Sequence, residues 1–355
     1  MNMKQQFWSK RIQDAVPYVP GEQPKDRAFM KLNTNECPYA PSPEVAEAVR
    51  RAGGAALRLY PDPECLELRR ALAGHYGLRE EQIFCGNGSD EILAFAFQAF
   101  FDPDRPIVYP EITYSFYPVY TRFFGLTARE IPMKEDFSID VDALCGGNGG
   151  VVLTNPNAPT GIALDLEAVE RIVRANPDAV VLVDEAYVDF GAESAVSLLD
   201  RYPNLLVVQT MSKSRSLAGL RVGWAMGQTE LIEALRCVRD SVNSYTLDRL
   251  AQAGAAAAVK DDAYFRATVA KVAMARERTR ARLLELGFAV LPSKANFLFV
   301  SYPGRSGAEL LAALRERGIL VRWWKDPRIS DWLRITIGTG EEMKTLCRVL
   351  EELVQ

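Results

Sequence analysis

LLVVQTMSKSRSLAGLR, residues 205–221, joins a short apolar run to a polar loop that contains one lysine. A continuous apolar run of this length is typical of a strand buried on both faces of a parallel sheet. A lysine amine with limited solvation and cationic neighbours has a lowered pKa and can attack a carbonyl carbon, so Lys213 is a candidate nucleophile. Ser212 and Arg221 offer a hydroxyl and a planar guanidinium, which suit a phosphate ester. The stretch therefore predicts a strand whose end holds a carbonyl compound that carries a phosphate.

Short apolar runs recur along the chain between residues 60 and 245 and alternate with helical patterns. Strands buried on both faces give such runs, so we expect an α/β fold with a mostly parallel sheet and helices on both faces. Gly86, Asn155 and Asp184 each follow one of these runs, as Lys213 does. Ligands of open α/β sheets gather at the carboxyl ends of the strands, so these residues are expected to meet in one site.

The distribution of residue types predicts three parts. Residues 1–40 are rich in proline and polar groups and are expected to form an extended N-terminal arm. Residues 41–245 are expected to form a large cofactor-binding domain. Residues 246–355 begin with an alanine-rich helical stretch from Leu250 to Leu286 and predict a smaller α+β domain.

Composition and charge argue against several classes of function. The 355 residues are 48% hydrophobic and 25% charged, with a formal net charge of −4, so no basic face for nucleic acid is expected. No membrane span or secretory signal is visible, and we expect a cytoplasmic protein. The six cysteines form no C-x-x-C pair and His75 is the only histidine, which argues against a disulfide framework, a metal site and a Ser-His-Asp triad.

The stretch around Lys213 resembles the S-K-x-x-x-L-A-G-L-R signature of fold-type I pyridoxal-phosphate aminotransferases, and the chain is most similar to the histidinol-phosphate aminotransferase family. Further blocks similar to that family occur in the same order, namely LNTNE at 32–36, YPD at 60–62, GNGSDE at 86–91, TYSFY at 113–117, NPNAPTG at 155–161, DEAY at 184–187 and LRIT at 333–336. Each block alone is a weak signal, whereas the ordered set is specific. The resemblance implies the fold-type I architecture, pyridoxal 5'-phosphate as the cofactor, and a homodimer. It also implies that the small domain packs with the N-terminal arm, and such a domain is expected to be able to close over a substrate.

Three residues are expected to carry the chemistry. Lys213 binds the cofactor aldehyde and, once the substrate amine has displaced it, moves the α-proton. Asp184 ends a run of four aliphatic residues, where a carboxylate is costly unless a cation such as a protonated pyridine nitrogen pairs with it. That pairing keeps the ring electron-poor. The resemblance implies that the hydroxyl of Tyr187 contacts the phenolate oxygen of the cofactor.

The GNGSDE block at residues 86–91 predicts a phosphate site. It lies between an apolar run and a helical pattern, and backbone N–H groups at the start of a helix bind anions. The block matches neither a Walker A motif nor G-x-G-x-x-G, which argues against a nucleotide. The resemblance implies that Ser89 and Asp90 contact the cofactor phosphate, and that Tyr60 reaches the phosphate bound by the other subunit.

Aromatic and basic residues complete the expected site. Tyr114 resembles the residue that stacks on the pyridine ring, with Phe116 and Tyr117 as alternatives. Arg334 would be a costly charge in a half-buried strand unless it meets an anion, and it resembles the arginine that binds the substrate carboxylate. Arg322 is a second candidate, for a substrate phosphate, with a surface ion pair as its alternative.

One position departs from the family pattern. The family usually has P-N-N-P-T-G, in which the asparagine before P-T-G binds the phenolate oxygen, whereas Ala158 stands there in this chain. An alanine side chain cannot donate that hydrogen bond. Asn157 is expected to replace the missing amide through a backbone shift of one residue. Asn155 is another amide nearby, and loss of the contact is the remaining alternative.

We therefore expect a transferase of histidine biosynthesis that moves an amino group between L-histidinol phosphate, or an aromatic amino acid, and 2-oxoglutarate. A lyase of the same fold, similar to threonine-phosphate decarboxylase, shares nearly all of these motifs and is the main alternative. A cofactor-binding regulatory domain and an NAD-linked oxidoreductase are further alternatives, because fold alone does not determine function. The low basicity argues against the first, and the missing glycine fingerprint against the second.

Overall fold

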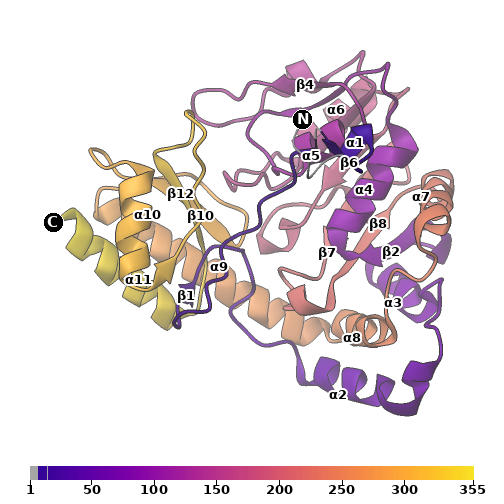
Figure 1. Ribbon diagram of the computed structural model, residues 1–355, viewed down its shortest axis with the longest axis horizontal. Helices are drawn as coiled ribbons and strands as arrows, with labels where there is room; N and C mark the ends of the chain where they lie inside the picture. Colours follow the sequence, from indigo (N-terminus) through magenta and orange to yellow (C-terminus); the bar gives the residue numbers. More distant parts are fainter. Residues whose placement is uncertain (1–6, 14) are drawn as a thin grey trace.

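The computed structural model describes residues 7–13 and 15–355, and its largest feature is a seven-stranded sheet (Figure 1). The strands lie in the order β2-β8-β7-β6-β5-β3-β4. Their bounds are β2 (Ile83–Asn87), β3 (Ile107–Pro110), β4 (Ala128–Ile131), β5 (Gly150–Thr154), β6 (Val181–Asp184), β7 (Leu205–Thr210) and β8 (Val222–Met226). All neighbours are parallel except β8, which runs antiparallel to both β2 and β7. The predicted, mostly parallel sheet is confirmed.

The exception at β8 has a simple cause in the chain connection. Parallel neighbours need a crossover of a dozen or more residues, usually a helix, whereas residues 211–221 between β7 and β8 contain only a short 3-10 turn. The loop that carries Lys213 therefore returns the chain antiparallel to β7. This return places Arg221, at the start of β8, beside the end of the strand that leads to Lys213.

Alternating side chains of the strands enter two apolar cores on opposite faces of the sheet. Val181 and Val183 of β6 face a core shared with helices α2, α3, α6 and α8, and Leu182 faces a core shared with α4, α5 and α7. The bounds of these helices are α2 (Pro43–Ala52), α3 (Leu66–Tyr76), α4 (Gly88–Phe100), α5 (Tyr117–Phe123), α6 (Leu166–Ala175), α7 (Thr229–Val242) and α8 (Arg249–Lys260). Because helices cover both faces, the residues of β6 and β7 are all buried.

A second unit combines the C-terminal part of the chain with a strand from near the N-terminus (Figure 1). Three antiparallel strands lie in the order β12-β10-β9, and β1 pairs in parallel with β11. The elements are β1 (Met30–Lys31), α9 (Asp262–Glu285), β9 (Ala289–Val290), β10 (Phe297–Ser301), α10 (Gly307–Glu316), β11 (Ile319–Leu320), β12 (Trp332–Thr336) and α11 (Gly340–Val354). The N-terminal segment thus packs with this unit, as expected.

The stretch expected to be one helix from Leu250 to Leu286 forms two helices, α8 and α9. Asp261 ends α8 and caps α9, because its carboxylate accepts a hydrogen bond from the backbone N–H of Tyr264 (3.3 Å). The α8 helix packs on the large sheet, whereas α9 contributes to the core of the second unit. The domain boundary after residue 245 stays a prediction.

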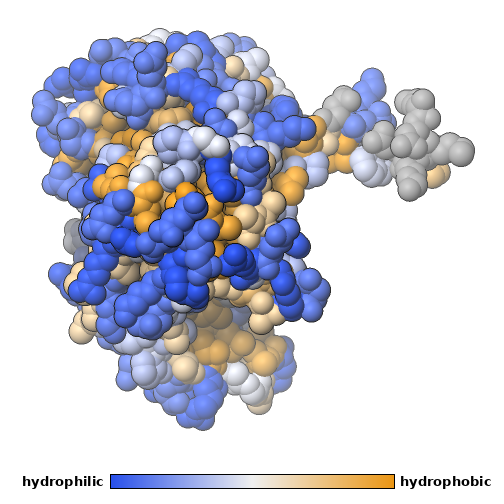
Figure 2. Space-filling view, turned by 90° about the vertical axis from the view of Figure 1, so that its left-hand side faces the viewer, coloured by the Kyte–Doolittle hydropathy of each residue, from blue (hydrophilic) through white to orange (hydrophobic). Residues whose placement is uncertain are grey.

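The first described residues include a short helix, α1 (Lys10–Gln13), that stands away from the body of the molecule (Figure 2). Short 3-10 helices connect the larger elements, namely η2 (Gly54–Arg58), η3 (Glu80–Gln82), η4 (Asp142–Leu144), η5 (Val188–Phe190), η6 (Ala195–Leu198) and η7 (Ala218–Leu220). Within residues 7–13 and 15–355, no helix has both the length and the apolar character needed to cross a membrane. The same residues contain no cluster of three or more His, Cys, Asp or Glu side chains suited to a metal ion.

Candidate active site

A cavity of about 410 Å³ lies where the carboxyl ends of the large-sheet strands face the second unit. Its walls include ten of the twelve residues predicted from the sequence, namely Ser89, Asp90, Tyr114, Asp184, Tyr187, Ser212, Lys213, Arg221, Arg322 and Arg334. They come from the carboxyl ends of β2, β3, β6 and β7 and the segments that follow them, from the residue directly before β8, and from the second unit. Tyr60 and Asn157 are the two that this cavity does not include.

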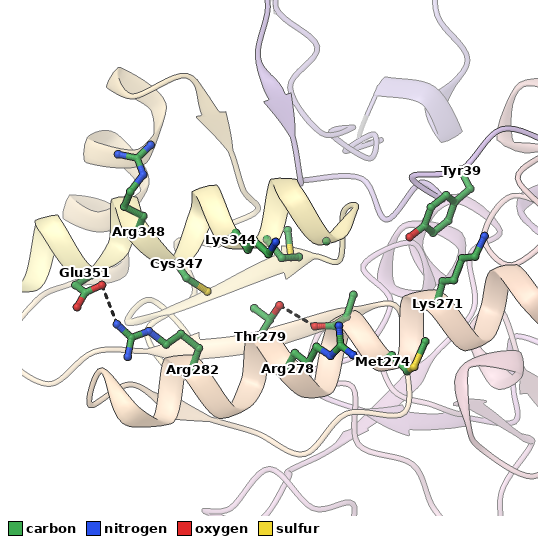
Figure 3. Close-up of a pocket in the computed structure, with 13 residues that line it drawn as sticks. Tyr39, Lys271, Met274, Arg278, Thr279, Arg282, Lys344, Cys347, Arg348 and Glu351 are labelled. Atoms are coloured by element: carbon green, nitrogen blue, oxygen red, sulfur yellow. Dashed lines mark hydrogen bonds and ion pairs between the residues drawn. The ribbon is translucent and has the colours of Figure 1, made fainter.

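A second cavity, of about 510 Å³, lies between α9 and α11 and is shown in Figure 3. None of the predicted site residues lines it. At one end the guanidinium of Arg282 forms an ion pair with Glu351 (2.8 Å), and Tyr39 and Lys271 lie at the other (Figure 3). The smaller cavity, which gathers a lysine, a buried carboxylate and several arginines, is therefore the candidate active site.

Lys213 extends from the loop after β7 into the smaller cavity. Its Nζ donates a hydrogen bond to the backbone oxygen of Thr34 (3.1 Å) and lies 5.9 Å from the ring centroid of Tyr187. Burial lowers the pKa of this amine to about 8, and the positive charge of Arg334 acts in the same direction. A substantial fraction of the amine is consequently neutral near physiological pH, which is the form that attacks a carbonyl carbon.

Asp184 is the last residue of β6, and its carboxylate is almost completely buried. It accepts hydrogen bonds from the Tyr117 hydroxyl (3.0 Å) and from the backbone N–H of Ala186 (3.1 Å). Burial raises the pKa of the carboxyl to about 6, although both hydrogen bonds act to lower it. A protonated ring nitrogen placed beside Asp184 would supply the cation that this buried carboxylate lacks.

A chain of hydroxyl groups supports the Asp184 carboxylate. The Tyr117 hydroxyl lies 2.6 Å from Thr154 Oγ1, which in turn lies 3.3 Å from Thr113 Oγ1. Because the single proton of the Tyr117 hydroxyl is given to Asp184, Thr154 donates to Tyr117 and Thr113 donates to Thr154. Tyr117 is expected from the sequence only as a stacking alternative to Tyr114, and its bond to Asp184 is a role that the sequence does not indicate.

The start of α4 and the start of β8 together form a cradle suited to a phosphate group. The guanidinium of Arg221 contacts Ser212 Oγ (3.4 Å) and Asp90 Oδ2 (3.2 Å). Asn87, the N-cap residue of α4, makes no side-chain capping bond, so the first N–H groups of the helix face the cavity without that partner. Uncapped helix N–H groups, a guanidinium and a hydroxyl fit a phosphate monoester.

Gly88 makes this cradle possible. Its φ is +78°, and a Cβ atom at this position would lie 2.5 Å from Arg221 Nη2. A side chain would therefore be strained by the backbone and would displace the arginine. Asp90 is held by the Tyr114 hydroxyl, which donates to its Oδ1 (2.8 Å), so the ring of Tyr114 is fixed beside the phosphate cradle.

Ala158, which replaces the asparagine usual in the family, lies in the cavity and contributes no amide group there. Ala158 lines the cavity, whereas Asn157 is completely buried behind it and donates hydrogen bonds to the Ile112 backbone oxygen and to Thr160 Oγ1 (both 3.0 Å). Both N–H bonds of the Asn157 amide are used there. The side chain of Asn155 bonds to the backbone of Leu164. The structure therefore does not bring either amide into the site.

Tyr187 lines the same cavity as Ala158 and receives a hydrogen bond from a residue outside the predicted site. Its hydroxyl accepts a hydrogen bond from Asn35 Nδ2 (3.0 Å). Burial raises the pKa of the Tyr187 phenol, whereas the charge of Arg334 and the hydrogen bond from Asn35 lower it. Asn35 belongs to the LNTNE block, so its position was visible in the sequence although its partner was not.

Two arginines occupy the end of the cavity next to the N-terminal segment. The guanidinium of Arg334 donates to the backbone oxygen of Asn33 (3.1 Å), lies over the ring of Trp324, and has a buried Nε without a partner. Arg322 donates to the backbone oxygens of Val19 (3.0 Å) and Pro20 (3.3 Å). Neither guanidinium forms an ion pair with a carboxylate of the described residues, so this end of the cavity suits an anion.

Tyr60 lies on the outer surface of its own chain. Its side chain is 77% exposed and stacks on Tyr245, with 4.5 Å between ring centroids. The Arg249 guanidinium donates to its backbone oxygen (2.9 Å). Within one chain, Tyr60 therefore does not contribute to the cavity.

Comparison with known proteins agrees with this geometry. The family model for aminotransferase class I and II matches residues 27–350. The histidinol-phosphate aminotransferase of Acetobacter pasteurianus is 56% identical over 348 residues, 98% of each chain, and that of Clostridium acetobutylicum is 51% identical over 348 residues, 98% of this chain and 99% of the relative. The solved histidinol-phosphate aminotransferase from Sinorhizobium meliloti, in complex with pyridoxal-5'-phosphate, has a TM-score of 0.87 at 26% identity and covers 98% of both chains. This likeness confirms the predicted fold class.

Proposed function

Because the chain belongs to the aminotransferase class I and II family, we propose that it transfers the amino group of L-histidinol phosphate to 2-oxoglutarate with pyridoxal 5'-phosphate as its cofactor. The observation that carries the proposal is the meeting of Lys213, Asp184 and Arg221 in one cavity. These three residues match the aldehyde, the ring nitrogen and the phosphate of that cofactor. The relatives from Acetobacter pasteurianus and Clostridium acetobutylicum, which each share more than half of their residues with this chain, are named for this amino donor.

Each group of the chain has a separate task in this proposal. The cofactor, when bound, supplies an aldehyde that captures an amine and a ring that withdraws electrons from the neighbouring carbon. Lys213 would hold the aldehyde carbon and, when its amine is free, would take the proton from the substrate carbon and deliver it to that former aldehyde carbon. Asp184 keeps the ring nitrogen protonated. Ser89, Ser212 and Arg221 hold the phosphate.

The basic end of the cavity supports the choice of substrates. L-histidinol phosphate carries a phosphate monoester and 2-oxoglutarate carries two carboxylates, so both are anions that a planar guanidinium binds well. Arg334 and Arg322 line the cavity, and the hydrogen-bond partners of their guanidinium groups among the described residues are backbone oxygens, not carboxylates. One anion site can therefore serve both substrates in turn. An aromatic amino acid, the second donor considered, would use only its carboxylate there.

A homodimer is part of the proposal. Tyr60 is exposed on its own chain, and a second copy could present it to the phosphate cradle of the first. Leu57, Leu59, Val242 and Tyr245 are exposed apolar residues that would also be covered by such a partner.

The decisive experiment follows the visible absorption of the bound cofactor. Protein reconstituted with pyridoxal 5'-phosphate should show a visible band that disappears when L-histidinol phosphate is added and returns when 2-oxoglutarate is added. Lys213→Ala should show no such cycle. Release of carbon dioxide from an amino-acid phosphate without this cycle would favour the lyase, and a band that only an aromatic amino acid removes would change the proposed donor.

A further inference from the structure

Tyr187 has only one hydroxyl proton, so the use of that proton depends on its neighbours. The hydroxyl accepts the N–H of Asn35 (3.0 Å) and therefore keeps its own proton free to donate into the cavity. With Ala158 at the position where an amide is usual, the contact with a phenolate oxygen of the cofactor depends more heavily on this single donor. The orientation of the Tyr187 hydroxyl is thus a functional property.

Neighbouring hydrogen bonds determine which way the Asn35 amide faces. The backbone N–H of Asn35 donates to Thr336 Oγ1 (3.0 Å), and the Thr336 hydroxyl donates to Asn35 Oδ1 (2.9 Å). Because Oδ1 accepts from Thr336, Nδ2 must face Tyr187. A flipped amide would reverse both bonds, because Tyr187 would then have to donate its proton to Oδ1 and Thr336 would have to accept a second N–H.

The backbone of Asn35 is also held in place. Its φ is +57°, a left-handed conformation that asparagine and glycine adopt more readily than other residues. Its backbone oxygen accepts a hydrogen bond from Asn296 Nδ2 (2.9 Å), and its side chain is buried. Three segments that are distant in the sequence thus place one amide N–H on the Tyr187 hydroxyl.

We propose that Asn35 is a positioning residue that orients the Tyr187 hydroxyl toward the phenolate oxygen of the cofactor, and that it takes over part of the task of the amide missing at Ala158. The inference rests on the proposed function, because it assumes that Tyr187 contacts the cofactor. Asn35 acts through Tyr187, and Thr336 acts through Asn35.

The test measures the pH midpoint of the visible absorption band in holoprotein. A donor on the phenolate oxygen favours loss of the proton that this oxygen shares with the nitrogen of Lys213, so a weaker donor should raise the midpoint. Asn35→Gly removes the amide and keeps the left-handed backbone free of strain. We expect the midpoint to rise by roughly half a unit to one unit, as suits one weakened hydrogen bond to a charged group.

A double-mutant cycle with Tyr187→Phe decides whether the effect passes through the tyrosine. Asn35→Gly should raise the midpoint in the wild-type background and leave it unchanged in the Tyr187→Phe background. An equal rise in both backgrounds, or no rise in the wild-type background, overturns the proposal. Asn176→Ala is the matched control, because it removes a buried amide that bonds to the backbone oxygens of Leu144 and Ile172 and to none of the residues around Tyr187, and it should lower thermal stability without moving the midpoint.

Two further outcomes are separated by the same measurements. If Asn35→Gly does not fold, Thr336→Val removes the hydroxyl that orients the amide, and an unchanged midpoint there overturns the proposal equally. If wild-type protein forms no visible band with pyridoxal 5'-phosphate, the proposed function fails. If the wild-type protein forms a normal band but the double-mutant cycle shows no coupling between Asn35 and Tyr187, only the role of Asn35 is rejected.

Discussion

At the scale of single residues, the pKa of Lys213 determines when the cofactor-free protein can react with pyridoxal 5'-phosphate. Burial and the charge of Arg334 disfavour the ammonium form, so the neutral amine accumulates as the pH rises through about 8 instead of through the ordinary value of 10.5. We expect the rate at which the visible band appears to rise about tenfold per pH unit below that point and to level off above it. Stopped-flow mixing of apoprotein with cofactor measures this curve.

Arg334→Met provides the control for the Lys213 curve. It removes a positive charge that lowers the pKa of the amine, so the curve should move to higher pH. Methionine keeps much of the apolar contact with Trp324. A wild-type rate that keeps climbing as steeply well above pH 8 would contradict the assigned pKa, and an unmoved curve in Arg334→Met would contradict its electrostatic cause.

Tyr117 is a second residue whose effect can be isolated. Its hydroxyl stabilises the charged form of Asp184, so Tyr117→Phe should raise the pKa of that carboxyl and weaken its hold on a protonated ring nitrogen. We expect kcat to fall about tenfold or more with a smaller change in KM, because a hydrogen bond to a charged group contributes about 1.5–3 kcal/mol. Steady-state kinetics measures both constants.

Tyr120→Phe is matched to that variant, since Tyr120 lies in the same helix and its hydroxyl donates to the backbone oxygen of Asp90 (2.8 Å) instead of to Asp184. It should leave kcat within a few fold of wild type. Equal losses in the two variants would mean that general packing of α5, and not the bond to Asp184, explains the result.

At the scale of helices and strands, the hydrophobic pattern of the sequence predicted those features that depend on the burial of neighbouring residues in the chain. The apolar runs of β5, β6 and β7 were recognisable because both faces of these strands are buried. Of the four residues predicted to meet at the strand ends, Asp184 and Lys213 line the cavity, whereas Gly86 and Asn155 do not. The direction of β8 depends on the length of the loop before it, and the break between α8 and α9 depends on the cap at Asp261. The periodicity of apolar residues contains no information on either feature. The bond between Asn35 and Tyr187 joins residues 152 positions apart, so no short-range pattern could indicate it.

The turn from β2 into α4 gives a prediction at this scale. Gly88→Ala places a Cβ atom 2.5 Å from Arg221 Nη2 in a left-handed backbone conformation, so the phosphate cradle should open. Because strain of this kind costs of order 1–3 kcal/mol, the Kd for pyridoxal 5'-phosphate should rise about tenfold or more. Equilibrium titration of the visible band measures the Kd.

A second glycine serves as the matched control for the cradle. Gly74 lies inside α3, and a Cβ there would meet no atom within 4 Å. Gly74→Ala should leave the Kd unchanged and stabilise the protein by roughly 0.5–1 kcal/mol, because alanine has the higher helix propensity. If both alanine variants bind the cofactor as wild type does, the role of Gly88 in shaping the cradle is wrong.

At the scale of the whole molecule, the exposed apolar face around Tyr60 is a candidate interface between two copies of the chain. Tyr60 and Tyr245 stack on each other at the surface, with Leu57, Leu59 and Val242 also exposed. A single chain gains nothing from exposing this group, since burial of apolar surface is favourable. If a symmetric dimer buried this face and placed each Tyr60 in the partner's cavity, as proposed, the active site would be a property of the pair.

Complementation between two inactive variants tests this shared site. Lys213→Ala removes the nucleophile, and Tyr60→Ala removes the residue proposed to cross, so each homodimer should be inactive or nearly so. In a mixed dimer, one cavity carries both defects and the other carries neither. Random reassortment makes half of the dimers mixed, so about a quarter of the cavities should regain full activity.

Mixing the variants under mild denaturant and refolding them should therefore restore activity, whereas refolding either variant alone should not. Mixed dimers that form, as shown by two different affinity tags, but remain inactive would place Tyr60 outside the partner's site.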